Sequence, residues 1–346
     1  MPSQSLEQIA QNLVASGKGI LAADESNGTM SKRLEAVNVE PSEHTRRAYR
    51  TAMFSSEGIE EYISGVILFD ETIRQKMDDG TPIPDYLISK GIIPGIKVDT
   101  GAKPLSWHEG ETVTEGLDGL RGRCEEYYRM GARFAKWRAV IKISGDLPSA
   151  AAISVNAHAL ARYAAICQEQ GIVPIIEPEV LMSGPHGLEQ CARTTSRILK
   201  AVYSECKIQG VNLKGTILKP NMVLSGAEAE KEDAESVGRA TAEVLKETVP
   251  QEVAGVAFLS GGQSDIDATS HLNETNLTIG NAPWPLTFSF GRALLADALS
   301  LWSKSDVEGA QARLRHRSKM NTLAAVGAWS SDCLLYTSPS PRDATL

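Results

Sequence analysis

Short, uninterrupted apolar runs alternate along the chain with longer stretches that have helical periodicity. Within each run the apolar residues occupy successive positions. Parallel strands that are buried on both faces of their sheet have this pattern, whereas half-exposed strands alternate apolar and polar residues. The pattern therefore predicts eight buried strands. They are residues 19–23, 65–69, 95–99, 133–137, 172–176, 216–218, 256–259 and 286–290.

Helical patterns fill the gaps between these runs. Residues 6–14 place their apolar side chains on one face of an opening helix. The alanine-rich stretch 150–170 stops at Gly171, a residue type that favours the position after a helix, and stretch 232–248 stops before Pro250. Eight strand–helix units in succession predict a closed (β/α)8 barrel, the TIM barrel, as the fold class.

A doubly wound sheet is the alternative architecture. Residues 17–22 (GKGILA) formally fit the start of the dinucleotide-binding glycine pattern, but they precede their strand, whereas the fingerprint glycines follow one. No internal repeat or polar linker divides the chain, so we predict a single domain over residues 1–332. Residues 333–346 lack periodicity and contain two closely spaced prolines. We expect a non-native or disordered tail there.

Composition and charge restrict the partners. Apolar residues make up 42% of the chain and charged residues 23%, as in soluble globular proteins. The net charge of −8, without long blocks of like charge, argues against nucleic acid or an anionic membrane surface as a partner. No run approaches the length of a membrane span. The first residues lack a secretory pattern and the cysteines lack Cys-x-x-Cys spacing, so we expect a reduced, cytoplasmic location.

Polar residues gather at the C-terminal ends of the predicted strands, which is the face where barrels of this kind keep their chemistry. In chain order these residues are Asp24, Lys97, Lys136, Arg138, Glu177, Lys219, Ser260, Ser289 and Arg292. The six histidines show no pair at a metal-ligand spacing, so we expect neither a metal nor a cofactor.

Lys219 ends an apolar run with a single amine followed by a proline. An ordinary lysine has a pKa of about 10.4, so only about one amine in 2,500 is free at pH 7. Burial and a second cation lower a lysine pKa and create a nucleophile. Lys136 is the candidate cation. Structural roles remain as alternatives: Lys219 and Glu177 could each be one half of an ordinary ion pair, and Asp24 could cap a helix.

Ser260, Gly261 and Gly262 follow the seventh predicted strand. A glycine-rich segment between a strand and a helix exposes backbone N–H groups, and barrels often hold phosphate in the loops after strands seven and eight. Arg292, at the next strand end, can add a bidentate charge. The alternative is that the two glycines only form a turn.

Taken together, these motifs resemble those of the class I, Schiff-base-forming fructose-bisphosphate aldolases. The resemblance runs from about residue 17 to residue 328. It implies a (β/α)8 barrel that reversibly cleaves fructose 1,6-bisphosphate to dihydroxyacetone phosphate and glyceraldehyde 3-phosphate without a metal, as a homotetramer. The matching segments are GKGILAADES (17–26), GVILF (65–69), GIKVD (95–99), FAKWR (134–138), PIIEPE (174–179), LKPNM (218–222), LSGGQS (259–264) and SFGRAL (289–294).

The resemblance also implies a role for each catalytic residue. Lys219 forms the imine with the ketone carbon of the substrate, and the protonated imine serves as the electron sink. Glu177 is the acid and base that dehydrates the carbinolamine. Asp24 takes the hydroxyl proton whose loss breaks the carbon–carbon bond. Lys136 helps to keep Lys219 neutral.

The remaining motif residues match phosphate-binding positions, which hold the sugar so that the chemistry becomes intramolecular. At one end of the substrate these are Ser260, Gly261, Gly262, Ser289 and Arg292. Towards the other phosphate they are Arg33, Lys97 and Arg138.

The chain departs from the family pattern in two places. The family's C-terminal tail ends in a tyrosine that assists proton exchange of the enamine, whereas Tyr336 lies in a different context. From this we expect cleavage with slow turnover. Thr100 stands where many members carry a lysine, which weakens the positive rim. Two alternatives to the main hypothesis are a Schiff-base aldolase for another sugar phosphate and a non-catalytic scaffold of the same fold.

Overall fold

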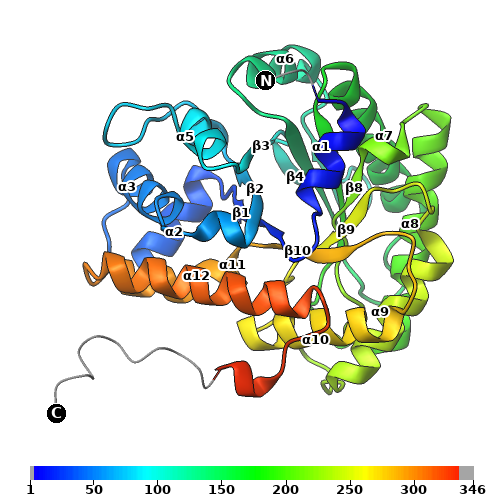
Figure 1. Ribbon diagram of the computed structural model, residues 1–346. Helices are drawn as coiled ribbons and strands as arrows, with labels where there is room; N and C mark the ends of the chain where they lie inside the picture. The colour runs from blue at the N-terminus through cyan, green and yellow to red at the C-terminus, as the bar shows by residue number, and fades with distance from the viewer. Residues whose placement is uncertain (1–3, 335–346) are drawn as a thin grey trace.

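A computed structural model describes residues 4–334, and its centre is a closed barrel of eight parallel strands (Figure 1). Around the barrel the strands follow the order β1-β10-β9-β8-β7-β6-β3-β2. This order confirms the predicted fold class. The barrel strands are β1 (Gly19–Ala23), β2 (Ile63–Leu68), β3 (Ile93–Lys97), β6 (Phe134–Ile141), β7 (Val173–Val180), β8 (Ile217–Leu218), β9 (Gly255–Phe258) and β10 (Leu286–Phe290).

The helices pack around the outside of the barrel (Figure 1). They are α1 (Leu6–Leu13), α2 (Asn27–Ala36), α3 (Glu43–Phe54), α4 (Asp70–Ile73), α5 (Ile83–Ser89), α6 (Leu120–Arg129), α7 (Ala150–Glu169), α8 (Leu188–Ile208), α9 (Ala234–Thr248), α10 (Asp265–Ile279), α11 (Arg292–Trp302) and α12 (Val307–Ala324). Three single turns of 3₁₀ helix accompany them at Ile59–Glu61, Leu213–Gly215 and Ser331–Leu334.

The capping residues explain where several helices start and stop. Ser26 is the N-cap of α2, and its hydroxyl accepts a hydrogen bond from the backbone N–H of Thr29. Asp233 caps α9 in the same way. After α7 the chain continues through Gly171 with φ +74°, the left-handed conformation that glycine adopts without cost. These boundaries agree with the helical stretches predicted from the pattern.

Strands β6 and β7 continue beyond their predicted ends. They pair in parallel from Phe134↔Val173 to Ile141↔Val180. The apolar runs end at residues 137 and 176, where Arg138 and Glu177 follow. The ladder nevertheless runs on, so Lys136, Arg138 and Glu177 lie within strands and not at their ends.

The apolar side chains form two groups. The larger one fills the layer between the strands and the surrounding helices. The smaller one lies inside the barrel and includes Ile9 and Leu13 from α1 and Val14 just after it, together with Phe134 and Ile175 from the strands. Helix α1 thus closes the N-terminal end of the barrel with apolar residues. The C-terminal end remains for polar side chains.

Glycine in β3 makes room for an aromatic ring inside the barrel. A Cβ atom on Gly95 would lie 2.3 Å from the ring of Phe134, far inside van der Waals contact. The ring therefore fills the barrel only because position 95 carries no side chain.

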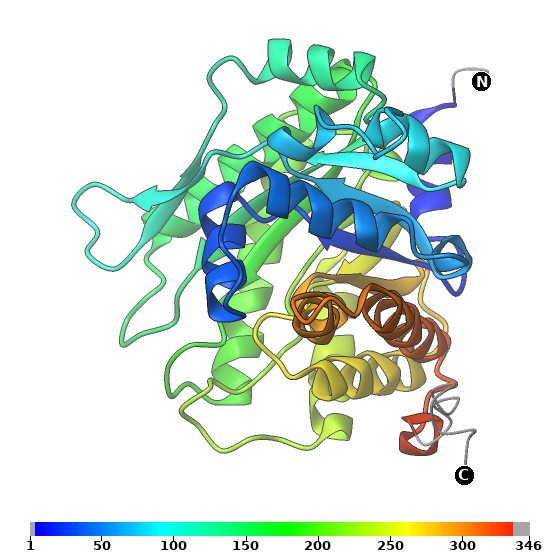
Figure 2. The same ribbon diagram turned by 90° about the vertical axis from the view of Figure 1, so that its left-hand side faces the viewer.

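An antiparallel hairpin, β4 (Gly101–Pro104) and β5 (Thr112–Glu115), follows β3. Figure 2 shows it projecting from one end of the barrel. None of the helices within residues 4–334 combines the length and the apolar character that a membrane crossing requires. The tail predicted from residue 333 remains a prediction, because Tyr336 and its neighbours lie outside the described residues.

Candidate active site

A cavity of about 840 Å³ opens at the C-terminal ends of the strands. Of the twelve predicted site residues, eleven line it, and Gly262, which follows the lining residue Gly261, does not. The eleven are Asp24, Arg33, Lys97, Lys136, Arg138, Glu177, Lys219, Ser260, Gly261, Ser289 and Arg292. Residues that are far apart in the sequence therefore share one site.

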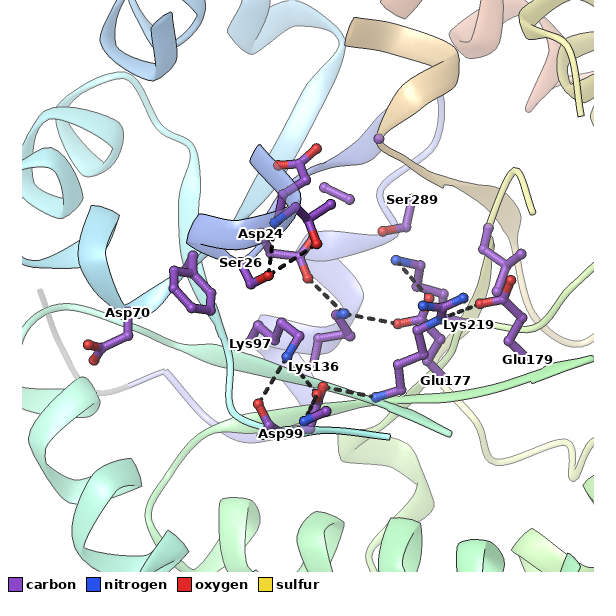
Figure 3. A pocket seen from close by; sticks show the side chains of 18 of the residues that line it. Asp24, Ser26, Asp70, Lys97, Asp99, Lys136, Glu177, Glu179, Lys219 and Ser289 are labelled. Carbon is purple, nitrogen blue, oxygen red and sulfur yellow. Dashed lines mark hydrogen bonds and ion pairs between the residues drawn. The ribbon is translucent and has the colours of Figure 1, made fainter. Parts of the chain in front are cut away.

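Four ionisable side chains form a continuous series of contacts in the floor of this cavity. Figure 3 shows Asp24, Lys136, Glu177 and Lys219 pointing towards one another. Lys219 Nζ lies 3.2 Å from Glu177 Oε1, and Lys136 Nζ lies 3.4 Å from Glu177 Oε2. Lys136 Nζ also lies 2.7 Å from Asp24 Oδ2. All four are at least nine-tenths buried, so these charges interact with little screening by water.

The four ionisable residues come from strands on different sides of the barrel. Lys219 directly follows β8, and Asp24 directly follows β1. Lys136 and Arg138 both project from β6 towards the cavity because side chains two apart share a face of a strand. Three strand positions separate β6 from β1 in the barrel order, so the long side chain of Lys136 spans the barrel to reach Asp24.

The ionisation of two of these residues follows from their surroundings. Burial by itself would raise the pKa of Asp24, but the positive charges of Lys136, Lys219 and Lys97 outweigh it and lower that pKa to about 2. Burial would likewise lower the pKa of Lys136, yet the carboxylates of Asp24, Glu177 and Asp99 raise it well above its ordinary value. At neutral pH Asp24 is therefore an anion and Lys136 a cation.

A second group of residues forms a polar, anion-accepting surface between β9 and α11. Gly261 and Gly262 have φ of +57° and +94°, a turn whose backbone N–H groups can converge on an anion. Ser289 is buried, and its Oγ atom has no hydrogen-bond partner among the described residues. Arg292 is the first residue of α11, and no carboxylate within residues 4–334 forms an ion pair with it.

The cations predicted to bind the other phosphate are all paired with carboxylates. Arg33 pairs with Glu25, and Arg138 pairs with Glu179. Lys97 Nζ lies 2.6 Å from Asp99 Oδ1. A phosphate arriving on this side has to share or exchange these partners, whereas Arg292 is available.

Sequence reasoning missed part of the cavity wall. Arg74, Arg123, Glu126 and Tyr127, from the region of α4 and α6, also line it. None of them stands at a strand end, and no residue pattern shows which side of a helix faces the cavity. The structure also decides against Asp24 as a helix cap: Ser26 caps α2, and Asp24 pairs with Lys136.

Among the described residues, no three His, Cys, Asp or Glu side chains lie together in a way that could hold a metal ion. The side chains in the floor of the cavity alternate between acids and lysines. This arrangement suits an amine nucleophile with a proton-transfer partner beside it.

Comparison with known proteins gives concordant results. The model of the class-I fructose-bisphosphate aldolase family matches residues 5–338. A probable fructose-bisphosphate aldolase class 1 of Xanthomonas campestris pv. campestris is 54% identical over 95% of this chain and 99% of its own length. The cytosolic fructose-bisphosphate aldolase 6 of Arabidopsis thaliana is 51% identical over 92% of this chain and 90% of its own.

A solved structure also matches. The fructose-bisphosphate aldolase of Plasmodium falciparum, crystallised with TRAP and a small molecule inhibitor, superposes with a TM-score of 0.92. It is 46% identical, and the match covers 94% of this chain and 95% of the other.

Proposed function

The chain belongs to the class I fructose-bisphosphate aldolase family, and we propose that its reaction proceeds through a Schiff base on Lys219. The enzyme cleaves fructose 1,6-bisphosphate reversibly to dihydroxyacetone phosphate and glyceraldehyde 3-phosphate. The observation that carries the Schiff-base proposal is the buried chain of Lys219, Glu177, Lys136 and Asp24 in the floor of the cavity.

Imine formation uses the first two members of this chain. The neutral amine of Lys219 attacks the ketone carbon C2 and forms a carbinolamine. Glu177, 3.2 Å from that amine, gives a proton to the departing hydroxyl, which leaves as water. The protonated imine that remains carries the positive charge that draws electrons from the neighbouring carbon–carbon bond.

Cleavage uses Asp24, which is ionised at neutral pH because its pKa is lowered to about 2. The carboxylate accepts the proton of the C4 hydroxyl, the C3–C4 bond breaks, and its electrons move into the imine to give an enamine. Glyceraldehyde 3-phosphate leaves as the aldehyde. Protonation of the enamine at C3 and hydrolysis of the imine then release dihydroxyacetone phosphate and regenerate Lys219.

Lys136 remains protonated throughout this sequence because its pKa is raised. Its positive charge lies 3.4 Å from Glu177 Oε2 and stabilises the carboxylate that forms when Glu177 has given up its proton. Lys136 also holds the carboxylate of Asp24 in place through their 2.7 Å contact.

The strand order supports an orientation for the substrate. Lys219 follows β8, and the Ser260–Gly262 loop and Arg292 follow its neighbours β9 and β10. C2 of the sugar is bonded to C1, so the C1 phosphate takes the site at Ser260, Gly261, Gly262, Ser289 and Arg292. The C6 phosphate then extends towards the remaining predicted cations of the cavity wall, Arg33, Lys97 and Arg138.

Borohydride trapping tests the proposal. The enzyme is mixed with dihydroxyacetone phosphate in the presence of EDTA, reduced, and mapped by peptide mass spectrometry. A reduced adduct on Lys219 that is absent in Lys219→Met supports both the imine and metal independence. An adduct elsewhere, or none while substrate still binds, would overturn the role of Lys219. Parallel rates with fructose 1-phosphate and tagatose 1,6-bisphosphate test whether another sugar phosphate is preferred.

We further propose a homotetramer in a reduced, cytoplasmic compartment. The free thiols of Cys124, Cys167, Cys191 and Cys206 are buried, which suits a reducing environment, and the Arabidopsis relative is named as cytosolic. Light scattering coupled to size exclusion measures the assembly directly. A monomer at micromolar concentration would contradict it.

A further inference from the structure

The loop Ser260–Gly262 has a conformation that its own sequence does not enforce. Gly261 and Gly262 both adopt left-handed φ values, and two adjacent glycines can adopt many other conformations. If the loop is to bind a phosphate with its N–H groups, another part of the protein has to select this conformation. Two residues outside the cavity make the required contacts.

Gln263 is the first of these residues. Its backbone N–H donates to the carbonyl oxygen of Ser260 at 3.0 Å, which closes the turn around the two glycines. Its side-chain Nε2 donates to the same carbonyl at 2.9 Å. The loop is thus held at its first residue by both the main chain and the side chain of Gln263.

His271 in α10 fixes the amide of Gln263. Its Nδ1 lies 2.5 Å from Gln263 Oε1. Because Nε2 of Gln263 faces the Ser260 carbonyl, the oxygen of the amide faces the ring, and an oxygen can only accept. The ring therefore donates from Nδ1. Burial lowers the pKa of His271, so at pH 7 the ring is neutral with its single proton on this nitrogen.

We propose that Gln263 and His271 are positioning residues that hold the Ser260–Gly262 loop in its phosphate-binding conformation and thereby set the affinity for the C1 phosphate. This inference rests on the proposed assignment of that loop to the C1 phosphate. Neither residue lines the cavity. They act through the loop. The apparent dissociation constant of a ligand is its intrinsic value divided by the fraction of molecules in the binding conformation, so a less populated binding conformation weakens binding in proportion.

The experiment compares His271→Asn with His271→Leu. The two replacements have the same branched shape, but the amide nitrogen of asparagine can occupy the place of Nδ1 and donate, whereas leucine cannot. Losing one such hydrogen bond shifts a conformational equilibrium by about two- to tenfold. We therefore expect His271→Leu to raise the KM for dihydroxyacetone phosphate about two- to tenfold in the condensation direction. His271→Asn should stay close to the wild type.

Glyceraldehyde 3-phosphate serves as the internal control, because its phosphate becomes the C6 phosphate of the product. Its KM and the kcat should change by less than twofold in His271→Leu. Inhibition by inorganic phosphate should weaken in the same proportion as the affinity for dihydroxyacetone phosphate. Gln263→Met, which keeps the length of the side chain but cannot donate to Ser260, should reproduce the same pattern.

Three results would overturn the inference: equal KM values in the leucine and asparagine variants, equal changes for both triose phosphates, or a wild-type KM for dihydroxyacetone phosphate in Gln263→Met. If His271→Leu does not fold, Gln263→Met alone decides. Arg292→Ala separates failure of this inference from failure of the site assignment. If that variant is inhibited by inorganic phosphate as strongly as the wild type, the site assignment itself is wrong.

Discussion

Replacing Asp24 by asparagine separates cleavage from imine formation. The amide has the shape of the carboxylate but cannot accept the C4 hydroxyl proton as a base. General base catalysis contributes about 10²- to 10⁴-fold, so we expect kcat for fructose 1,6-bisphosphate to fall by this factor, or about 3 to 5 kcal/mol in activation free energy. Imine formation should continue, because Lys219 and Glu177 keep their 3.2 Å contact.

The assay is the composition of the trapped adduct. With fructose 1,6-bisphosphate and borohydride, the wild type should carry mostly the three-carbon adduct on Lys219, since cleavage precedes reduction. Asp24→Asn should carry the six-carbon adduct, heavier by one glyceraldehyde 3-phosphate. A three-carbon adduct in the variant would refute the role of Asp24 as the base, and the absence of any adduct would place Asp24 in imine formation instead.

The same substitution has a stability consequence with a defined pH dependence. Asp24 has an ordinary pKa of 3.8, lowered to about 2 in the folded protein, which corresponds to about 2.5 kcal/mol of stabilisation at neutral pH. This contribution is fully present above pH 3.8 and is lost as the pH falls towards 2. In urea unfolding, the difference in unfolding free energy between the wild type and Asp24→Asn should therefore decrease by about 1 kcal/mol as the pH is lowered from 5 to 3. A constant difference would contradict the ionisation argued here.

The other substitutions should give distinguishable results. Glu177→Gln should slow the appearance of the trapped imine itself about 10²- to 10⁴-fold, because the acid that expels water is lost; normal trapping with slow cleavage would contradict this. Lys136→Met removes the cation that holds the Asp24 carboxylate at 2.7 Å, so cleavage should slow more than trapping on Lys219; equal slowing of both steps would favour a purely structural role. Gly95→Ala drives a methyl group into the ring of Phe134, 2.3 Å away, and should cost about 1 to 3 kcal/mol in unfolding free energy. A melting temperature equal to that of the wild type would show that the barrel relaxes around the added methyl group.

The barrel could be predicted because its signal is local and repeated. Each run of buried residues identifies a strand by itself, and eight runs in succession leave few other architectures. The ends of β6 and β7 were less certain for a physical reason. A charged residue inside a strand breaks the apolar pattern, yet at the polar end of a barrel Lys136 and Glu177 lie within strands that continue to Ile141 and Val180.

The site was predicted as a set of residues but not as a set of contacts. The positions of Lys219 and Asp24 follow from where their strands end, and that of Glu177 follows from its place in the polar part of β7. The contact between Lys136 and Asp24 could not be predicted in this way, because it depends on the order of the strands around the barrel and on the length of the Lys136 side chain. The carboxylate partners of Arg33 and Arg138 depend on side-chain packing in the same way.

The supporting residues were invisible in the sequence for a deeper reason. His271 lies eight residues beyond Gln263, and no sequence motif or residue spacing connects the two. It matters because about two turns of α10 bring its ring to the amide of Gln263, which holds a loop whose two glycines do not fix its conformation. Sequence patterns identify residues whose chemistry is unusual, such as a buried lysine. An ordinary histidine that selects one conformation of a neighbouring loop becomes apparent only through its contacts, so the residues that tune affinity are the ones for which a structure adds most.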